Sequence, residues 1–189
     1  MTAPNDPTDP TSPPRRRWRW LGELAVVLAA VLAIHLYQTW DTATGVAPPL
    51  EGVDLSGRPL TLTELRGQPV LVHFWATWCP ICRLEEDSIQ AISQDWTVFS
   101  VALEDTPVEA LRAYRREAGL SFPTLRDVDG QLAARYGVRG VPTSIVVDAN
   151  GNIRFTSVGY TTGLGLRLRL WLATTFPRGS SRTPQPSPA

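Results

Sequence analysis

The sequence predicts an α/β domain in which a central sheet is flanked by helices. Two patterns carry this prediction: short, nearly continuous apolar runs that are typical of strands buried on both faces, and amphipathic stretches between them that are typical of helices. Length agrees, because 189 residues are enough for one domain with a sizeable core and additional terminal segments.

The first half of the chain predicts four elements. Turn residues 56–58 separate two short β-forming stretches, and a near-continuous apolar run follows them. Behind this run, apolar residues recur at helical spacing and predict the buried stripe of a helix, formed by Ile81, Leu84, Ile89 and Ile92. The expected elements are a hairpin at 53–55 and 60–62, a central strand at 69–75, a helix at 79–94 and a buried strand at 98–103.

The second half begins with a helix start signal. Thr106 is expected as the N-cap, Pro107 fits the first helical position, and Glu109 completes a capping box. Farther on, residues 148–151 (Asp-Ala-Asn-Gly) form a strong hairpin signal. The expected elements are a helix at 107–118, a short helix at 132–136, strands at 144–147 and 153–158, and a closing helix at 164–176.

Composition excludes several classes of function. Eighteen basic and eighteen acidic residues balance, so nothing indicates a nucleic-acid partner. Every basic residue is arginine, which excludes a lysine Schiff base and a P-loop lysine. The chain holds two cysteines and two histidines, so potential metal ligands are scarce.

The segment from Trp18 to Trp40 is expected to be an uncleaved transmembrane anchor. As a helix it measures about 34 Å, enough to cross a bilayer core of about 30 Å, with aromatic residues near both ends. The fully apolar core at 24–34 is short and also suits a cleaved signal peptide, which remains the alternative. However, the small residues of a cleavage site do not follow it.

Arginines at positions 15, 16, 17 and 19 predict that the N-terminus is cytoplasmic and that the following domain lies outside, in an oxidising compartment. Residues 1–17 and 177–189 are rich in proline and small polar residues, which is typical of disorder. The expected organisation is a cytoplasmic tail at 1–17, an anchor at 18–40, a linker at 41–49, a folded domain at 50–176 and a tail at 177–189.

The cysteines form a CxxC motif where the central strand passes into a helix. Cys79 is expected at the helix N-terminus, where the macrodipole and free N–H groups favour a thiolate. Pro80 fits the first turn, and Cys82, one turn further in, can resolve a mixed disulfide. Catalysis is therefore assigned to Cys79 as the attacking thiol and Cys82 as the resolving thiol.

The sequence supports two other roles of the pair, a structural disulfide and a zinc site, less well than a redox role. A disulfide that closes so small a loop constrains little of the unfolded chain and stabilises it little. A zinc site needs about four ligands, and the two histidines, His35 and His73, form no second ligand pair. Transient binding of copper(I) by the two thiolates remains open. We expect no resident metal or cofactor.

Two stretches carry a family resemblance: VHFWATWCPIC and, about sixty residues later, YGVRGVPTSIVVDANGNI. They resemble the thioredoxin superfamily and, more closely, its bacterial membrane-anchored TlpA-like thiol–disulfide oxidoreductases. The Pro-Ile dipeptide and His73 resemble the suppressor-of-copper-sensitivity D type within that branch. The resemblance spans about residues 47–176 and implies a thioredoxin fold, a mixed sheet flanked by helices with an added N-terminal hairpin.

The resemblance also implies site residues. Pro142 is expected in a cis peptide bond facing the disulfide, in a groove that binds an extended substrate. The groove residues are Trp78, Pro80, Ile81, Val141, Pro142 and Thr143. His73 stands where thioredoxins usually carry a buried aspartate, so it is either a proton relay to the resolving thiol or a core histidine without a kinetic role.

The expected function is reduction or exchange of disulfides in extracytoplasmic proteins, at the bacterial inner membrane and on its periplasmic side. Pro80-Ile81 supplies no charge and lacks the histidine that strongly oxidising CxxC proteins carry, which argues against an oxidase. The resemblance implies a transmembrane thiol electron transporter as reductant and suggests a role in copper tolerance. The alternatives are a cytochrome c maturation thioredoxin and a non-catalytic copper-handling protein.

Overall fold

The computed structural model describes residues 21–30 and 43–176 of the chain, which divides into two units, 1–38 and 39–189. In the first unit, residues 21–30 are helical and exposed. Within the two described ranges, no helix is long and apolar enough to cross a membrane. The predicted anchor lies largely outside these ranges, at 18–20 and 31–40, and the two predicted tails lie outside them entirely.

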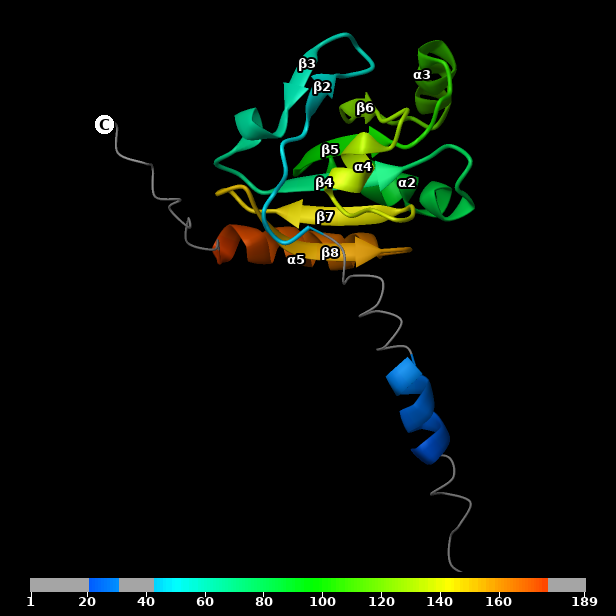
Figure 1. Ribbon diagram of the computed structural model, residues 1–189, viewed down its shortest axis with the longest axis vertical. Helices are drawn as coiled ribbons and strands as arrows, with labels where there is room; N and C mark the ends of the chain where they lie inside the picture. Colours follow the sequence, from blue (N-terminus) through cyan, green and yellow to red (C-terminus); the bar gives the residue numbers. More distant parts are fainter. Residues whose placement is uncertain (1–20, 31–42, 177–189) are drawn as a thin grey trace, which may run out of the picture. The chain divides into compact units, whose positions relative to one another are not determined.

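The domain is built on a six-stranded mixed sheet (Figure 1). Its strands are β1 (Gly45–Val46), β4 (Val70–Trp75), β5 (Thr97–Ala102), β6 (Thr124–Arg126), β7 (Thr143–Val147) and β8 (Asn152–Val158). The order is β1-β8-β7-β4-β5-β6, in which β4, β5 and β6 are parallel while β7, β8 and β1 pair antiparallel. The near-continuous apolar run puts β4 at the centre, and all six of its residues are buried.

Helices and loops cover both faces of this sheet. The helices are α2 (Pro80–Ile92), α3 (Val108–Glu117), α4 (Gln131–Arg135) and α5 (Gly163–Thr175), with a 3-10 turn, η1, at Leu62–Leu65. Alternate residues of β4 point to opposite faces, so Leu71 and Trp75 join the core under α2 and α5, while Val72 and Phe74 join the core that includes Ala133 of α4. The central strand therefore anchors two apolar cores.

The predicted N-terminal hairpin is present, but its first strand lies two residues and its second one residue earlier than expected: β2 (Glu51–Val53) and β3 (Pro59–Thr61) form an antiparallel pair separate from the main sheet. The predicted turn at 148–151 also forms, with Gly151 at a φ of 83° and its N–H bonded to the carbonyl of Asp148. The mixed sheet with helices on both faces agrees with the predicted α/β thioredoxin architecture.

Two short strands were not expected from the sequence. Residues 45–46 lie in the predicted linker, yet they form β1 by pairing with β8. Residues 124–126 form β6 at the opposite edge of the sheet. Neither segment is long enough to carry a readable period, so only pairing with a neighbouring strand defines it.

The predicted stripe of α2 is wrong in part. Ile89 and Ile92 are buried as expected, but Ile81 and Leu84 are exposed. The buried face of α2 instead begins with Cys82 and Glu85. Because the helix starts at the redox motif, its first two turns present their apolar side chains to solvent and their sulfur and carboxyl groups to the interior.

The predicted capping box of α3 does not form. The hydroxyl of Thr106 donates a hydrogen bond of 2.6 Å to the carboxylate of Glu104, and Pro107 occupies the N-cap position without a side-chain cap. Glu109 pairs with Arg112 on the helix surface. The Thr106 hydroxyl thus bonds to the Glu104 carboxylate instead of capping the first turn of α3.

Candidate active site

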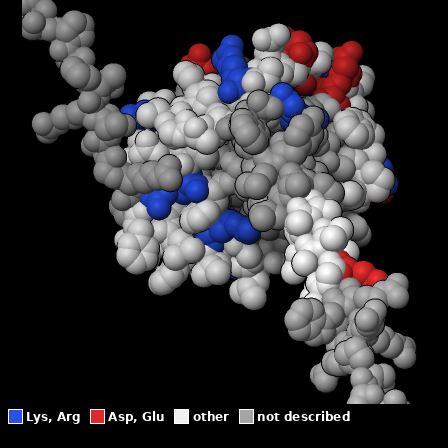
Figure 2. Space-filling view, turned by 60° about the horizontal axis from the view of Figure 1, so that its bottom comes forward, with Lys and Arg blue, Asp and Glu red and all other residues white. Residues whose placement is uncertain are grey.

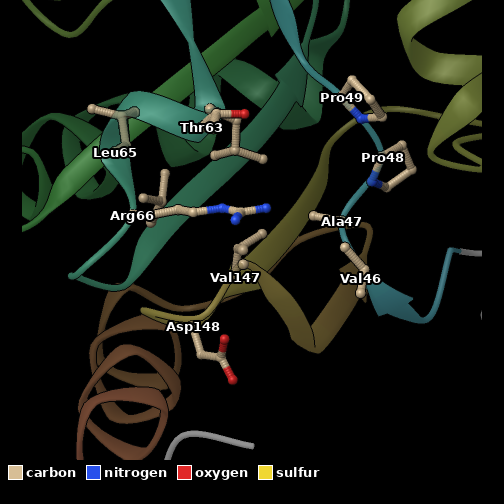
Figure 3. Close-up of a pocket in the computed structure, with 12 residues that line it drawn as sticks. Val46, Ala47, Pro48, Pro49, Thr63, Leu65, Arg66, Val147 and Asp148 are labelled. Carbon is tan, nitrogen blue, oxygen red and sulfur yellow. The ribbon is translucent and has the colours of Figure 1, made fainter. Parts of the chain in front are cut away.

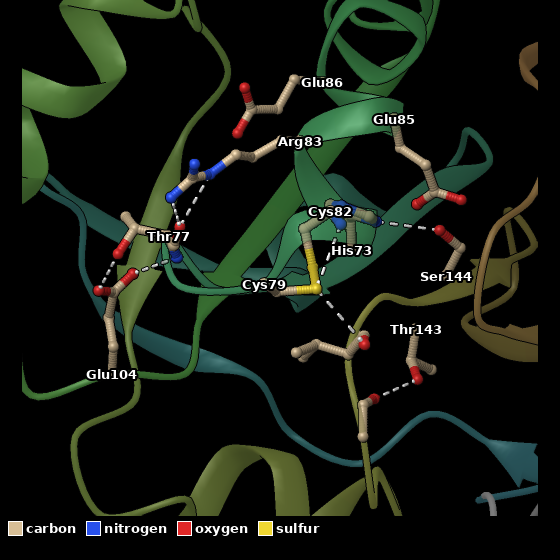
Figure 4. Close-up of a disulfide and its surroundings, with 12 residues drawn as sticks. His73, Thr77, Cys79, Cys82, Arg83, Glu85, Glu86, Glu104, Thr143 and Ser144 are labelled. Carbon is tan, nitrogen blue, oxygen red and sulfur yellow. Dashed lines mark hydrogen bonds between the residues drawn. A yellow bond between two sulfur atoms is a disulfide. The ribbon is translucent and has the colours of Figure 1, made fainter.

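The two cysteines form a disulfide where β4 leads into α2 (Figure 4). Cys79 occupies the N-cap of α2, Cys82 lies in its first turn, and their Cα atoms are 5.3 Å apart. The backbone N–H of Cys82 donates a hydrogen bond of 3.2 Å to Sγ of Cys79. An N–H donor and the positive end of a helix dipole both stabilise a thiolate, so this geometry favours ionisation of Cys79 in the reduced state.

Three exposed apolar side chains, called the apolar rim here, lie close to the cysteines in the sequence. Cys79 is 4% exposed and Cys82 is 1% exposed, whereas Trp78, Ile81 and Leu84 are 64%, 45% and 71% exposed. Large apolar side chains gathered at a surface are typical of a site that contacts other proteins. The rim therefore provides an apolar contact surface at the start of α2, the element that carries both cysteines.

A loop from the other half of the domain faces Cys79. The Val141–Pro142 peptide bond is cis, and the carbonyl oxygen of Val141 lies 3.6 Å from Sγ of Cys79. Pro142 is buried, and its carbonyl accepts a hydrogen bond of 2.8 Å from the N–H of Gly159. Thr143 is also buried and donates its hydroxyl to the carbonyl of Gly140, so only its backbone is available to flank a groove.

A second set of contacts fixes the loop before the disulfide. The carboxylate of Glu104 accepts two hydrogen bonds from Thr77, at 3.0 Å from its N–H and 2.8 Å from its hydroxyl. The guanidinium of Arg83 donates two hydrogen bonds to the Thr77 carbonyl (Figure 4). Thr77 is thus held from both sides, which limits movement of the segment that carries Trp78 and Cys79.

His73 lies in the interior, on the face of β4 that also contributes to the core around the disulfide. Its Nδ1 is 3.0 Å from the hydroxyl of Ser144, its direct partner on β7. Burial lowers the pKa of His73 to about 4, because desolvation penalises the imidazolium form. The ring is therefore neutral at physiological pH, which supports a hydrogen-bonded core histidine rather than one that exchanges protons near neutrality.

Glu85 is a buried carboxyl group one helical turn after Cys82, on the same face of α2. One carboxyl oxygen accepts the N–H of Thr161, while Oε2 has no hydrogen-bond partner among the described residues. Burial raises the pKa of Glu85 to about 7, although the Thr161 contact acts in the opposite direction. Glu85 is therefore the titratable group of this interior that changes charge near neutral pH.

Replacing Glu85 with glutamine should change the pH dependence of stability. The pKa of Glu85 is about 7 in the folded protein and 4.5 ordinarily, so folding favours its protonated form. The contribution of this group to the free energy of unfolding is complete below pH 4.5 and is lost as the pH rises through 7. His73 acts oppositely, since its lowered pKa makes stability fall as pH drops from 6.5 to about 4.

The free energy of unfolding of Glu85→Gln, measured against wild type by urea titration from pH 4.5 to 8, should therefore match wild type at the acid end. It should exceed wild type by up to about 3 kcal/mol at the alkaline end. A difference that stays constant with pH would contradict the titration of Glu85 in this range.

The described residues contain no group of three or more histidine, cysteine and acidic side chains placed to hold a metal ion. The Cys79–Cys82 pair would thus contribute two sulfurs to a metal without a third such ligand in residues 21–30 and 43–176. A redox function of the pair requires no further ligand.

A cavity of about 180 Å³ lies at the other end of β4, beside Val70, the first residue of the strand (Figure 3). Residues 46–49 and η1 line it, and the side chain of Arg66 extends across it. Because the disulfide follows the last residue of β4, this cavity does not belong to the redox site.

The structure brings most of the predicted site residues together. Cys79, Cys82, Trp78, Pro80 and Ile81 lie at the start of α2, and Val141 and Pro142 face them from the β7 side. Two acidic residues of this region were missed. Glu85 was detectable, because it continues the spacing of Cys82, Ile89 and Ile92, whereas nothing local marked Glu104, which reaches Thr77 from the segment after β5.

Comparison with known proteins agrees with this geometry. The AhpC/TSA family matches residues 44–156. The thioredoxin-like protein YneN of Bacillus subtilis is 32% identical over 157 residues, which cover 76% of this chain and 92% of that protein. The thiol:disulfide interchange protein DsbE of Pseudomonas fluorescens is 30% identical, with 75% of this chain and 85% of that protein covered.

Solved structures agree as well. The crystal structure of a thioredoxin-family thiol:disulfide interchange protein from Chlorobium tepidum superposes with a TM-score of 0.61 at 28% identity. The superposition covers 70% of this chain and 98% of that one.

Proposed function

Since the chain belongs to the AhpC/TSA family of thioredoxin-like proteins and is a thiol–disulfide oxidoreductase, we propose that it is a membrane-anchored enzyme that reduces or exchanges disulfides of extracytoplasmic proteins. The observation that carries the proposal is the Cys79–Cys82 disulfide at the N-terminus of α2, facing the Val141–Pro142 loop, with exposed apolar side chains in the same segment. A site of this form suits a protein substrate rather than an enclosed small molecule.

In the reduced enzyme, Cys79 is the attacking thiolate. It attacks one sulfur of the substrate disulfide, forms a mixed disulfide with that sulfur, and releases the other substrate sulfur as a thiolate that takes up a proton. The Cys82 N–H and the dipole of α2 stabilise the Cys79 thiolate before attack. The Val141 carbonyl beside Cys79 suits backbone pairing with an extended substrate segment.

Cys82 then resolves the mixed disulfide. Its thiolate attacks Sγ of Cys79, the intramolecular disulfide forms, and the second substrate sulfur leaves as a thiol, so two electrons and two protons pass to the substrate. Glu85, one turn away on the same buried face and with a pKa of about 7, is placed to accept the proton of the Cys82 thiol. A transmembrane thiol electron transporter is the proposed donor that returns the enzyme to the dithiol.

The proposed direction of electron flow predicts a reducing potential. Pro80 and Ile81 put no positive charge beside Cys79. The dipeptide therefore adds nothing to the stabilisation of the Cys79 thiolate, and hence of the reduced form, by the helix dipole and the Cys82 N–H. Equilibration of the full chain with glutathione buffers should give a potential between about −270 and −200 mV. A value near −120 mV, typical of a strong oxidant, would contradict a reductase.

The Ile81→His variant provides the matched control. It places a cation-forming side chain between the cysteines and should move the potential towards the oxidising end, because the reduced form gains a partner for its thiolate. An unchanged potential in this variant would show that the dipeptide does not set the direction of electron flow.

The extracytoplasmic location rests on the arginine-flanked apolar segment at 18–40 and on the similarity to thiol:disulfide interchange proteins. We place the N-terminus in the cytoplasm and the domain on the periplasmic side of a bacterial inner membrane. Fractionation followed by a sodium carbonate wash tests this, because an anchored chain stays with the membranes and a cleaved one is released.

Copper tolerance and cytochrome c maturation differ in the substrate and not in the chemistry at the cysteines. The resemblance of Pro80-Ile81 and His73 to the suppressor-of-copper-sensitivity D type favours the first. Identification of the proteins trapped by a Cys82→Ser variant in cells grown with and without copper distinguishes the two substrates.

A further inference from the structure

Helix α5 is apolar on two opposite sides. Leu166, Leu170 and Ala173 are completely buried against the sheet. On the outward side, Leu164, Leu168 and Trp171 are 80%, 54% and 53% exposed, at the spacing i, i+4 and i+7 that forms one ridge along a helix. Residues 164, 168 and 171 are called the outward ridge here. A helix that is apolar on all sides is normally buried on all sides, whereas the outward ridge is exposed to solvent.

The charged side chains of α5 itself are both arginines. No acidic residue occurs after Asp148, and the described part of that segment carries Arg154, Arg167 and Arg169. Arg167, on one flank of the ridge, pairs with Asp95, whereas Arg169 lies on the other flank. In Figure 2, which turns the lower edge of Figure 1 forward, the lower part of the domain shows arginines among uncharged side chains, and its acidic side chains gather at the upper rim.

The described chain enters the domain at the β8 edge of the sheet, on the face opposite α5, where the N–H of Ala43 binds the carbonyl of Tyr136. The proposed anchor ends at Trp40, and the described part of the domain begins at Ala43, so the three intervening steps of chain span at most about 11 Å. Residues 45–46 form the sheet edge next to β8. Phe155 of β8 packs in the same core as Leu166 and Leu170, so α5 covers the sheet at this edge.

We propose that the outward ridge of α5 docks on the surface of a bilayer that contains anionic lipids. This inference rests on the proposed anchor at 18–40. Leucine and tryptophan side chains bury readily at the boundary between headgroups and acyl chains, and a flanking arginine can extend to lipid phosphates. A short tether, an unbroken apolar ridge and a helix whose charged side chains are all arginines favour a lipid surface over a second copy of the chain, which would bury the leucines but bring the arginines of two copies together.

Docking of α5 also sets the position of the redox site. The N-terminal end of α5 adjoins α2, since the N–H of Thr161 binds Glu85 and Gly163 packs against Ser88. The disulfide at the start of α2 would thus be held close to the membrane surface. Disulfides of partners that reach this surface are then the accessible substrates.

Hydrogen exchange of the full chain in lipid vesicles tests the inference. In vesicles that contain 30% phosphatidylglycerol, the amides of residues 164–172 should exchange at least fivefold more slowly than in pure phosphatidylcholine vesicles. Leu168→Glu should remove this difference, because it puts an acid on the ridge, and it should leave insulin reduction in detergent unchanged. The matched control Val53→Glu, at an exposed valine of β2, should behave as wild type.

Three results would overturn the inference. Equal exchange in both vesicles, with the chain retained after a carbonate wash, would reject docking and leave the anchor intact. Release of the chain by the wash would reject the anchor and the docking that rests on it. Protection that increases with the ratio of protein to lipid and accompanies dimers in sedimentation would assign the ridge to a second copy.

Discussion

Replacing Cys79 with serine should lower the rate of insulin reduction by at least about 1,000-fold, because the serine hydroxyl remains protonated and cannot open a disulfide. Replacing Cys82 with serine should also stop turnover, but it should leave Cys79 able to attack. Since Cys82 is then unable to release the substrate, the Cys82→Ser variant should accumulate mixed disulfides. Non-reducing electrophoresis of membranes followed by mass spectrometry measures this accumulation.

The control for trapping is the double variant Cys79→Ser with Cys82→Ser, which removes both cysteines of the chain and should trap nothing. The assignment of roles is contradicted if the Cys79→Ser variant traps partners through Cys82 as efficiently as the reverse variant does. The burial of Cys82 and the exposed rim beside Cys79 predict a strong asymmetry between the two.

Replacing Trp75 with alanine should cost about 3–5 kcal/mol of the free energy of unfolding. Trp75 is 2% exposed at the end of the central strand, where its indole N–H donates to the hydroxyl of Ser100 and its ring lies 6.0 Å from that of Tyr114. Its removal leaves a large cavity in the core that contains the disulfide, whereas the Ser100 hydroxyl keeps its hydrogen bond to Thr124. Urea unfolding of the full chain in detergent, followed by circular dichroism, measures the loss.

Trp78→Ala is the matched control, since the same residue type three positions later is 64% exposed. Its free energy of unfolding should remain within about 0.5 kcal/mol of wild type, while disulfide exchange with protein substrates should weaken. Equal destabilisation by both substitutions would mean that burial does not distinguish the two tryptophans.

Much of the fold was predictable because its signals are local. The apolar run of β4 and the hairpin turn at 148–151 each require only neighbouring residues, and these elements formed within one or two residues of their expected bounds. β1 and β6 were not predictable, since two or three residues carry no period and acquire their structure from the strand beside them.

The candidate site likewise has a part that the sequence predicts and a part that it does not. The CxxC spacing and the strand-to-helix junction define the redox pair without further information. The hydrogen bonds around the redox pair come from residues distant in the chain. Ser144 bonds to His73, Thr161 to Glu85 and Glu104 to Thr77. Burial by these elements moves the pKa of His73 to about 4 and that of Glu85 to about 7, so Glu85, which was not among the predicted site residues, changes charge near neutral pH and His73 does not.

The sequence by itself therefore determined the chemistry of this protein, a dithiol at a helix start, because the helix dipole and the cysteine spacing are properties of one contiguous segment. Only the tertiary structure decided which titratable group changes charge near neutral pH and which faces of α2 and α5 stay exposed. The physical reason is that desolvation and packing depend on the neighbours that surround a side chain in space, and those neighbours lie up to 76 positions away in the chain.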